Sequence, residues 1–505
     1  PAAIQLVTCR QEGGADFMPE AHGKLTGPPG VCIVTRGPGA TNASIGVHTA
    51  RQDSTPMILF VGQVGRDLME REAFQEIDYR RMYGQMAKWV ASIDSVERIP
   101  EYVHRAYQTA VAGRAGPVVL ALPEDVLAGT ACVENMAAYR ESPAYAGAND
   151  LACLEQLLES AQRPLMILGG SGWTVAAKAS IQAFSERVAV PVAVSFRRQD
   201  LFDNRHPNYA GHVGLGIAPS LAQRVRQSDL LLVVGSRLSE ATTGAYTLIT
   251  PRHPGQILAH VYPDPQELGR VHEVDLPMNA HIAAFAAQTA GLRIRPNAMR
   301  ESWRHDVCSE YGGDLALPDV RFEADLAEVV TWLNEHLPDD AIVTNGAGNY
   351  AGWVHRYYQY SPQRRQLAPT NGAMGYGVPA AVAAKLEFPA RTVVCFSGDG
   401  CFMMNGQELA TAVQYGAAVV FIVVNNGMYG TIRMHQEAAY PGRVSGTTLS
   451  NPDFAALAHA CGAYGQKITS TAEFPGAFER ALAVRRPALI EICTDPAAVS
   501  ARSHG

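Results

Sequence analysis

The sequence predicts an α/β fold made of three doubly wound parallel-sheet domains, and two observations support this. Apolar, β-branched runs recur along the chain with segments of helix length between them, and most runs are apolar at every position. Such runs are typical of strands covered on both faces, and their alternation with helices is typical of parallel sheets. The length of 505 residues also exceeds what one hydrophobic core usually serves.

Each domain is predicted from its own group of runs. The gaps at 133–155 and about 291–319 contain no long apolar run, and the first is rich in Ala, Pro, Gly and Asn, as a linker would be. They place the domains at 1–135, 155–290 and 325–495. The chain starts without Met on what looks like the middle of a fold, so we expect N-terminal residues to be missing. The expected strands are 31–35, 57–62 and 117–122, then 165–170, 191–196 and 230–235, and finally 341–346, 392–398, 419–424 and 488–493.

The composition is that of a globular protein. With 47% hydrophobic residues, 18% charged residues and a formal net charge of −7, nothing favours nucleic acid or an anionic membrane as a partner. Nine cysteines without a C-x-x-C pair are expected to be core residues of a reducing compartment. No run approaches about 18 apolar residues and the start does not resemble a signal peptide, so a cytoplasmic location is expected.

One stretch, "SGDGCFMMNGQELATAVQYGAAVVFIVVNN" (397–426), combines two strands and a helix with polar strand ends. Asp399 ends the first strand between two glycines, and Asn425 and Asn426 end the second, at the same rim of a parallel sheet. Carboxylate, amide and backbone carbonyl oxygens are ligands for Mg²⁺ or Ca²⁺. Either motif alone is more often a turn or a strand cap. With Asn426 standing 27 positions after Asp399, the pair favours a diphosphate held through a divalent ion.

This stretch resembles the diphosphate and Mg²⁺ motif of thiamine diphosphate (ThDP) dependent enzymes. The resemblance implies ThDP and Mg²⁺ as cofactors, with the ion held by Asp399, Asn426 and the backbone carbonyl of Met428. It also implies a fold of pyrimidine-binding, central and diphosphate-binding domains. The further cofactor-binding residues implied in this stretch and just after it are Gly398, Gly400, Cys401, Tyr429 and Gly430.

Three other segments complete the resemblance. "TNGAMGYGVPAA" (370–381) resembles the acetolactate synthase turn in which a Met supports the bent cofactor, which implies Met374 with the backbone of Gly372 and Ala373. "NGAGNY" (345–350) matches a diphosphate-contacting position and implies Asn349 and Tyr350, although the usual residues there differ. "RQEGGADFMPEAHGKLTGPPGVCIVTRGPGATN" (10–42) implies Glu12 as the catalytic acid that activates the cofactor, whereas Glu20 is expected to serve structure.

The resemblance covers nearly the whole chain and is closest to the acetolactate synthase large subunit, through "GPGATN" (37–42), "AFQEIDY" (73–79) and "AKW" (87–89). It implies cleavage and formation of C–C bonds next to the carbonyl of a small 2-oxo acid, with carboligation as the outcome. Glu12 and Asp399 would meet across a subunit interface, so a homodimer at least, and commonly a homotetramer, is expected. The implied substrate-channel residues are Phe74, Gln75, Lys88 and Gln436; a core aromatic and a surface charge are the alternatives for Phe74 and Lys88.

Several departures keep other activities open. After the Asn pair, "GMYGTIRMHQEAAYPGR" (427–443) lacks the Trp that selects the acceptor in acetolactate synthases. A decarboxylase that does not ligate, or another lyase, hydrolase or acyltransferase of the family, is therefore an alternative. The central domain has only partial flavin-binding patterns, so FAD is possible but doubtful. "LGGSGW" (168–173) allows a nucleotide-binding scaffold as a remote alternative, although G-x-G-x-x-G is absent from this stretch.

Overall fold

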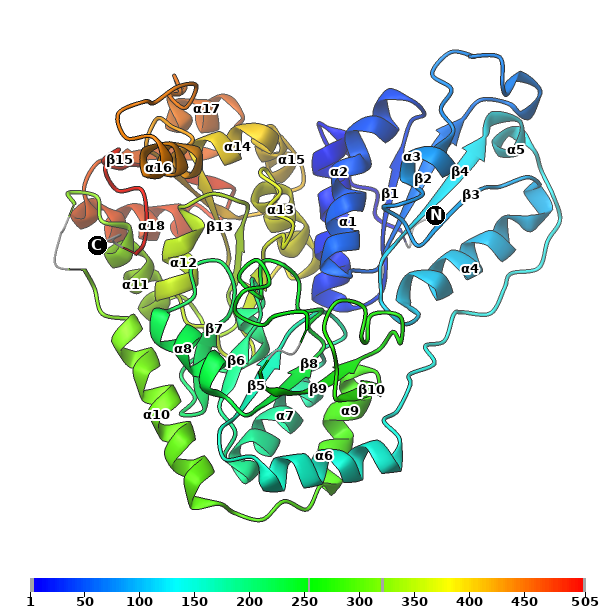
Figure 1. Ribbon diagram of the computed structural model, residues 1–505. Coiled ribbons are helices and arrows are strands. Elements are labelled where there is room, and N and C mark those ends of the chain that lie inside the picture. The colour runs from blue at the N-terminus through cyan, green and yellow to red at the C-terminus, as the bar shows by residue number, and fades with distance from the viewer. Residues whose placement is uncertain (1–3, 253–254, 319–321, 503–505) are drawn as a thin grey trace. The chain divides into compact units, whose positions relative to one another are not determined.

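The computed structural model describes residues 4–252, 255–318 and 322–502. The chain forms two compact units, each described by itself below. One comprises Pro1–Glu141, Val320–Val354 and Leu367–Ala501, and the other Ser142–Asp319, His355–Gln366 and Arg502–Gly505. The first unit holds two sheets and the second holds one (Figure 1). All three sheets are parallel, so the predicted fold class is confirmed; the domain boundaries stay predictions.

The first domain is a four-stranded sheet in the order β1-β2-β4-β3. Residues of α2 and α3 pack on one face of this sheet, and residues of α4 and α5 pack on the other, as in a doubly wound fold. The helix α1 lies beside α2 (Figure 1). The elements are α1 (Glu12–Thr26), β1 (Gly30–Val34), α2 (Pro38–Asp53), β2 (Met57–Gln63), α3 (Tyr79–Tyr83), β3 (Trp89–Ser92), α4 (Ile99–Val111), β4 (Pro117–Pro123) and α5 (Glu124–Ala128).

The third domain is a six-stranded sheet in the order β12-β11-β13-β14-β16-β15. Its core includes apolar residues of α13, α15 and α17, and Phe17, Ala21 and Leu25 of α1 join this same core. The helix α1 therefore connects the two sheets of the first unit. The elements are α11 (Leu326–His336), β11 (Ile342–Asn345), α12 (Ala351–Tyr357), β12 (Arg365–Leu367), α13 (Gly377–Glu387), β13 (Val393–Gly398), α14 (Asp399–Asn405), α15 (Glu408–Gln414), β14 (Val420–Asn425), α16 (Gly430–Ala439), α17 (Phe454–Ala460), β15 (Tyr464–Ile468), α18 (Phe474–Ala483) and β16 (Ala488–Cys493).

The central domain is a six-stranded sheet in the order β10-β9-β8-β5-β6-β7. Numbered within the domain, this is the strand order of dinucleotide-binding doubly wound sheets. Helices α6, α7 and α9 pack on one face, and α8 and α10 on the other. The elements are α6 (Ala148–Ser160), β5 (Pro164–Leu168), α7 (Val175–Val188), β6 (Val192–Val194), β7 (Tyr209–His212), α8 (Pro219–Gln227), β8 (Leu230–Val234), β9 (Ile257–Tyr262), β10 (Leu276–Asn279), α9 (Ile282–Gln288) and α10 (Ala298–Asp314).

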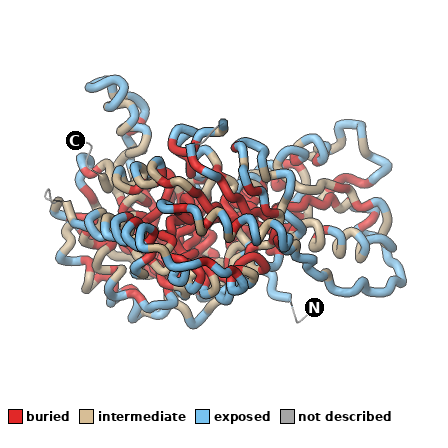
Figure 2. Tube along the Cα trace, turned by 60° about the horizontal axis from the view of Figure 1, so that its bottom comes forward, coloured by how far each residue is buried: buried red, intermediate tan, exposed pale blue. Residues whose placement is uncertain are grey.

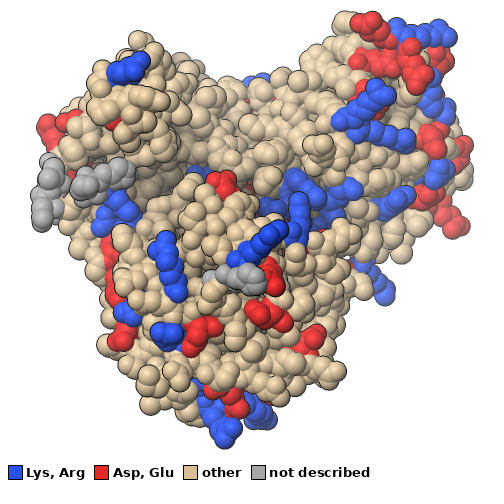
Figure 3. Space-filling view, in the orientation of Figure 1, with Lys and Arg blue, Asp and Glu red and all other residues tan. Residues whose placement is uncertain are grey.

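Burial follows the layers. Buried segments run along the strands, whereas exposed positions lie on the outer helices and loops (Figure 2). On the face shown in Figure 3, acidic and basic side chains are both present, and acidic side chains gather at the top right of the view. All nine cysteines are free thiols, and Cys32, Cys395 and Cys401 are buried as core residues. Among the residues that are described, no helix is long and apolar enough to cross a membrane.

Candidate active site

A cavity of about 250 Å³ opens at the carboxyl ends of β11, β13 and β14, where parallel sheets usually bind ligands. It is built from three loops that each follow a strand, together with the turn before α13. The residues predicted as cofactor-binding converge on this cavity, with Ala373 and Glu12 outside its lining. The lining residues are Ala347, Gly348, Asn349, Tyr350, Gly372, Met374, Gly398, Asp399, Gly400, Cys401, Val424, Asn426, Met428, Tyr429, Gly430, Thr431 and Ile432.

Asp399 is the first residue of α14, directly after β13. Its Oδ1 accepts the N–H of Gly400 at 2.8 Å, and its Oδ2 accepts the N–H of Gly427 at 2.9 Å and the Asn451 amide at 2.7 Å. Burial raises the pKa of this carboxyl above its usual value, and these hydrogen bonds partly oppose the rise. The carboxyl is thus held in one orientation at the cavity wall.

The two Asn residues that end β14 have different surroundings. Asn425 donates to Glu491 Oε1 at 2.8 Å and accepts from Asn451 at 2.9 Å, so its side chain is used within the protein. Asn426 lines the cavity, and its Oδ1 accepts the N–H of Met428 at 3.2 Å. The second Asn is therefore the one available to a ligand. Sequence reasoning missed Asn451, since "SNPD" indicates only a turn.

The oxygen atoms at this wall fit a hard divalent cation. Asp399 contributes a carboxylate, Asn426 an amide oxygen and Met428 a backbone carbonyl, and all three residues line the same cavity. Within residues 4–252, 255–318 and 322–502, no group of three His, Cys, Asp or Glu side chains could hold a metal. A site with one carboxylate and neutral oxygens suits Mg²⁺, which keeps waters and takes phosphate oxygens.

Glycines keep this wall thin. A Cβ at Gly398 would lie 2.7 Å from the ring of Tyr350, and a Cβ at Gly400 would lie 2.6 Å from the ring of Tyr429. At Gly372, whose φ is +73°, a Cβ would meet no atom within 4 Å. The first two positions require glycine because aromatic rings pack on the backbone, and the third borders open space where a ligand can approach the main chain.

Side chains at the inner end of the cavity are tied to one another. The Tyr350 hydroxyl donates to Cys401 Sγ at 3.1 Å, and the N–H of Gly375 points to the same sulfur at 3.2 Å. Asn349 accepts from Thr431 Oγ1 at 2.9 Å and donates to the carbonyl of Val499 at 2.6 Å. The loop after β11 is therefore fixed against both α14 and the start of α16.

The turn that carries Met374 is held by the first domain. Asp53 of α2 accepts the N–H of Thr370 at 2.8 Å and also the Thr370 hydroxyl. On the other side of Met374, the Tyr376 hydroxyl donates to Glu20 Oε2 at 2.5 Å. Both anchors lie on helices of the first domain, so its packing fixes a turn that belongs to the third domain.

These anchors share one buried cation, Lys24. Its ammonium pairs with Glu20 at 2.9 Å and also with Asp53, and all three side chains are buried. Burial raises the pKa of Glu20, and Lys24 opposes this rise. Burial also tends to raise the pKa of Asp53, but the interactions with Lys24 and Thr370 outweigh this effect and lower the pKa. Glu20 serves structure here, in agreement with what we expected.

Glu12 is the first residue of α1, in the first domain. Its Oε2 accepts the Asn42 amide at 3.0 Å, and Gly39 packs close to Oε1. The residues that line the cavity of the same chain do not include Glu12. The predicted acid thus lies outside the cavity that the predicted metal ligands line in the same chain.

The predicted channel residues do not gather in one place. Phe74 is 77% exposed and Gln75 packs on Gly37, both near the carboxyl end of β1. Lys88 lies at the opposite edge of the sheet, since its N–H bonds to Pro117 at the start of β4. Gln436 is bound to the backbone of Ser445 at 2.8 Å. Their assignment to a channel stays a prediction.

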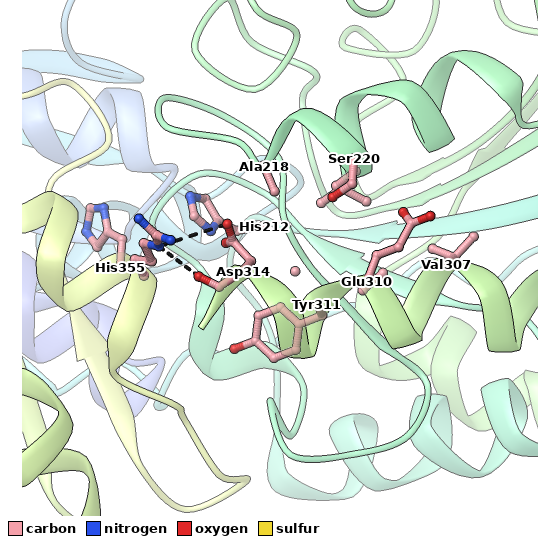
Figure 4. A pocket seen from close by; sticks show the side chains of 12 residues that line it. His212, Ala218, Ser220, Val307, Glu310, Tyr311, Asp314 and His355 are labelled. Carbon is pink, nitrogen blue, oxygen red and sulfur yellow. Dashed lines mark hydrogen bonds and ion pairs between the residues drawn. The ribbon is translucent and has the colours of Figure 1, made fainter. Parts of the chain in front are cut away.

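Two other cavities differ from this one. A groove of about 590 Å³ lies at the amino ends of β13 and β14, on the edge of the sheet away from Asp399. In the second compact unit, His212, Tyr311, Asp314 and His355 surround a space of about 10 Å³, the size of one water (Figure 4). Burial lowers the pKa of His212 to about 4, and it also lowers the pKa of His355 well below the ordinary value of a histidine. We assign the catalytic role to neither.

Three models of one family match the chain. The description "Thiamine pyrophosphate enzyme, N-terminal TPP binding domain" matches residues 1–82, the central domain of that enzyme matches 151–289, and its C-terminal TPP binding domain matches 346–492. Thiamine pyrophosphate is another name of ThDP. The chain belongs to the thiamine pyrophosphate enzyme family, and it is a ThDP-dependent enzyme.

Within this family, the chain is similar to curated acetolactate synthase large subunits. An acetolactate synthase isozyme 2 large subunit of Escherichia coli K12 is 29% identical over 97% of this chain and 89% of its own length. An acetolactate synthase large subunit of Corynebacterium glutamicum is 30% identical over 97% of this chain and 80% of its own length. A probable acetolactate synthase large subunit of Methanocaldococcus jannaschii is 30% identical over 98% of this chain and 86% of its own length. The predicted resemblance is confirmed. That FAD is possible but doubtful stays an expectation from the sequence.

Proposed function

We propose that this enzyme uses ThDP and Mg²⁺ to break and form C–C bonds next to the carbonyl of a small 2-oxo acid, as an acetolactate synthase-like carboligase. The observation that supports it most is the convergence of Asp399, Asn426, Met428 and Met374 on one cavity at the carboxyl edge of the third sheet. The names of the relatives, all acetolactate synthases, support the same reaction class.

The chain's own residues divide the work. Asp399, Asn426 and the backbone carbonyl of Met428 would hold Mg²⁺, and the ion would supply positive charge for a diphosphate at the glycine-lined wall. Met374, fixed by its two anchors, would pack against the bound cofactor. When bound, ThDP supplies a nucleophilic carbon and an electron sink for loss of CO₂ from the oxo acid. The Glu12 carboxyl exchanges a proton with N1′ of the aminopyrimidine.

Glu12 serves the cavity of a second copy in this proposal. Its position outside the cavity of its own chain supports a homo-oligomer in which the site is completed by a partner. The family resemblance points to a dimer as the minimal active form. Analytical ultracentrifugation of the holoenzyme, together with activity after mixing Glu12→Gln and Asp399→Ala chains, tests this: partial recovery of activity in mixed dimers is expected.

The first turn of α16 supports a small substrate. Ile432 lines the cavity and is 53% exposed, whereas Arg433 is paired with Glu437 at 2.7 Å. The cavity side of this turn therefore offers an apolar side chain, and its nearest cation is already neutralised. A short alkyl group next to the reacting carbonyl suits this wall better than a second carboxylate does.

The product profile tests the reaction. Incubation of the holoenzyme with pyruvate, alone and with 2-oxobutyrate, followed by NMR of the products, should show acetolactate or its mixed analogue. Acetaldehyde with no ligated product would instead identify a decarboxylase. If neither oxo acid loses CO₂ in the presence of ThDP and Mg²⁺, while other 2-oxo acids also fail, the proposed function is wrong.

A further inference from the structure

A buried carboxylate outside the cavity contacts the start of the helix that carries Glu12. Glu408 is the first residue of α15, in the third domain, and its side chain is fully buried. It accepts the N–H of Arg10 at 3.0 Å and the N–H of Gln11 at 3.0 Å. Its other neighbour is Thr411, whose hydroxyl donates to Oε2 at 2.6 Å. Both backbone donors immediately precede Glu12.

The contact fixes the beginning of α1. Gln11 is the N-cap of this helix, and its Oε1 accepts the N–H of Gly14 at 3.0 Å. Glu408 packs so closely that a Cβ at Gly14 would lie 2.8 Å from its Cγ. A carboxylate at a helix N-terminus satisfies exposed N–H groups and interacts favourably with the helix dipole. Glu408 thus acts as a cap supplied by another domain.

Residues at the C-terminal end of α15 contact the backbone and side chains that lead into α1. The Arg10 guanidinium donates to Gln414 at 2.7 Å, and the N–H of Thr8 donates to the Tyr415 hydroxyl at 2.7 Å. Of these contacts, only the Glu408 contact is buried and charged and adjoins Glu12. The stretch from Asp399 through the end of α15 therefore also restrains the backbone next to Glu12.

We propose that Glu408 is a positioning residue for Glu12, so that the proton exchange at N1′ depends on a carboxylate that touches neither substrate nor cofactor. This rests on the proposed function of Glu12. A general acid must lie within hydrogen-bond reach of its partner atom, and a shift of about 1 Å in such a group can cost about 100-fold in rate. Removing the two hydrogen bonds at Arg10 and Gln11 allows a shift of that kind.

The test uses Glu408→Ala and Glu408→Gln in the ThDP and Mg²⁺ loaded enzyme. We measure hydrogen–deuterium exchange at C2 of bound ThDP, ThDP affinity by calorimetry, and thermal unfolding. Glu408→Ala should slow exchange about 100-fold and leave affinity nearly unchanged. Glu408→Gln keeps one acceptor oxygen in the same shape, and it should slow exchange by about 10-fold while folding normally.

Asp325→Asn is the matched control. Asp325 is a buried carboxylate that caps α11 through the N–H groups of Ala327 and Glu328, and α11 carries no predicted site residue. This variant should lower the unfolding temperature without slowing exchange. On a Glu12→Gln background, Glu408→Ala should cause no further slowing, because it acts through Glu12.

The outcomes separate the two proposals. Wild-type enzyme without C2 exchange contradicts the proposed function, and the role of Glu408 with it. Wild-type exchange that Glu408→Gln and Glu408→Ala leave within twofold overturns only the positioning role. An equal slowing by Asp325→Asn, or an additive loss in the double variant with Glu12→Gln, also overturns it, since a general loss of stability would then explain the effect.

Discussion

The first and third domains share the order of four strands, but the side chains at the carboxyl ends of these strands are used differently. Four strands of the third sheet run β13-β14-β16-β15, and the four strands of the first sheet run β1-β2-β4-β3, so each strand of the first sheet has a counterpart, whereas β12 and β11 of the third sheet have none. At the third-domain edge, Asp399 and Asn426 line an open cavity. At the first-domain edge, Gln63 ends β2. Its side-chain amide donates to the carbonyl of Ile77, and its Oε1 accepts the N–H of Val64. One topology therefore provides a place for a ligand, and the side chains decide whether that place is used.

The two edges also differ in their glycines. Gly37 of the first domain is covered by Gln75, and its N–H donates to the Tyr79 hydroxyl oxygen at 2.9 Å. Gly398 and Gly400 of the third domain instead border the cavity. The acid proposed for catalysis in the first domain comes from α1, which precedes its sheet. Two parallel sheets can thus share a strand order while the side chains and glycines at their corresponding edges are used differently.

Removing the metal carboxylate should have the largest effect. In Asp399→Ala the hard-oxygen set loses its only charge, so Mg²⁺-dependent ThDP binding should weaken by more than about 100-fold, the upper end for loss of a residue that merely supports a metal ligand. Turnover should fall with it. Calorimetry with and without Mg²⁺ measures this. The control is Gln63→Ala at the corresponding edge of the first domain, which should leave the metal requirement as it was.

Next in size is the loss of the catalytic acid. Glu12→Gln should lower turnover by about 10²–10⁴-fold, the usual contribution of a positioned acid or base, and should leave ThDP affinity nearly unchanged. Steady-state kinetics and calorimetry on the same preparation separate the two effects. An equal loss of affinity in Glu12→Gln would mean that the first-domain acid acts in binding, and the contrast between the domains would fail.

The third largest effect is expected from breaking the buried cluster of Lys24, Glu20 and Asp53, which anchors the Met374 turn of the third domain to the first domain. Asp53→Asn removes the negative charge that pairs with buried Lys24 and weakens the contacts to Thr370, and it should cost about 3–5 kcal/mol of stability at pH 7. Because the folded pKa of Asp53 is lowered, this contribution is present above its ordinary pKa and is lost as the pH falls through the folded pKa. Urea unfolding at pH 7 and at a pH well below 3.8, the ordinary pKa of an Asp carboxyl, checks the sign; wild-type stability of Asp53→Asn at pH 7 would contradict it.

The smallest effect is expected at Asn451. This residue orients Asp399 without lining the cavity, so Asn451→Ala should weaken Mg²⁺-dependent ThDP binding by about 10–100-fold. Asn451→Asp places a second carboxylate beside Asp399. Repulsion between the two carboxylates should raise the Mg²⁺ concentration needed for half-saturation by a factor that differs from the factor for Asn451→Ala. Titration of Mg²⁺ at fixed ThDP measures both. Binding unchanged in either variant would show that Asp399 is held by its backbone contacts alone.

Much of the fold followed from the sequence, and the missed strands have a common reason. Each predicted run contains a strand, from β1 at Gly30–Val34 to β16 at Ala488–Cys493. The strands that were not predicted are β3, β7, β9, β10, β12 and β15. All but β9 stand at the edge of a sheet, where one side lacks a neighbour and the run is shorter or more polar. In β9, His260 interrupts an otherwise apolar run.

Of the candidate site, the sequence indicated the residues that stand at strand ends and in the glycine-rich turn. Asp399, Asn426 and Met374 could be predicted because their spacing is local to one βαβ unit or one turn. Asn451 could not, since it reaches Asp399 from 52 positions away. Glu408 and Asp53 could not either, because a single carboxylate on a helix usually faces solvent.

By itself the sequence determined the strands, the polar groups at their ends and therefore the edge that can hold a diphosphate. These depend on short runs that are apolar at nearly every position and end in polar residues, so they can be recognised from neighbouring residues alone. The tertiary structure alone decided that Glu408 meets Arg10 and Gln11, that Asp53 meets Thr370, and that Glu12 lies outside the cavity of its own chain. Such contacts join residues hundreds of positions apart, and they exist only because α1 packs against both sheets of its unit.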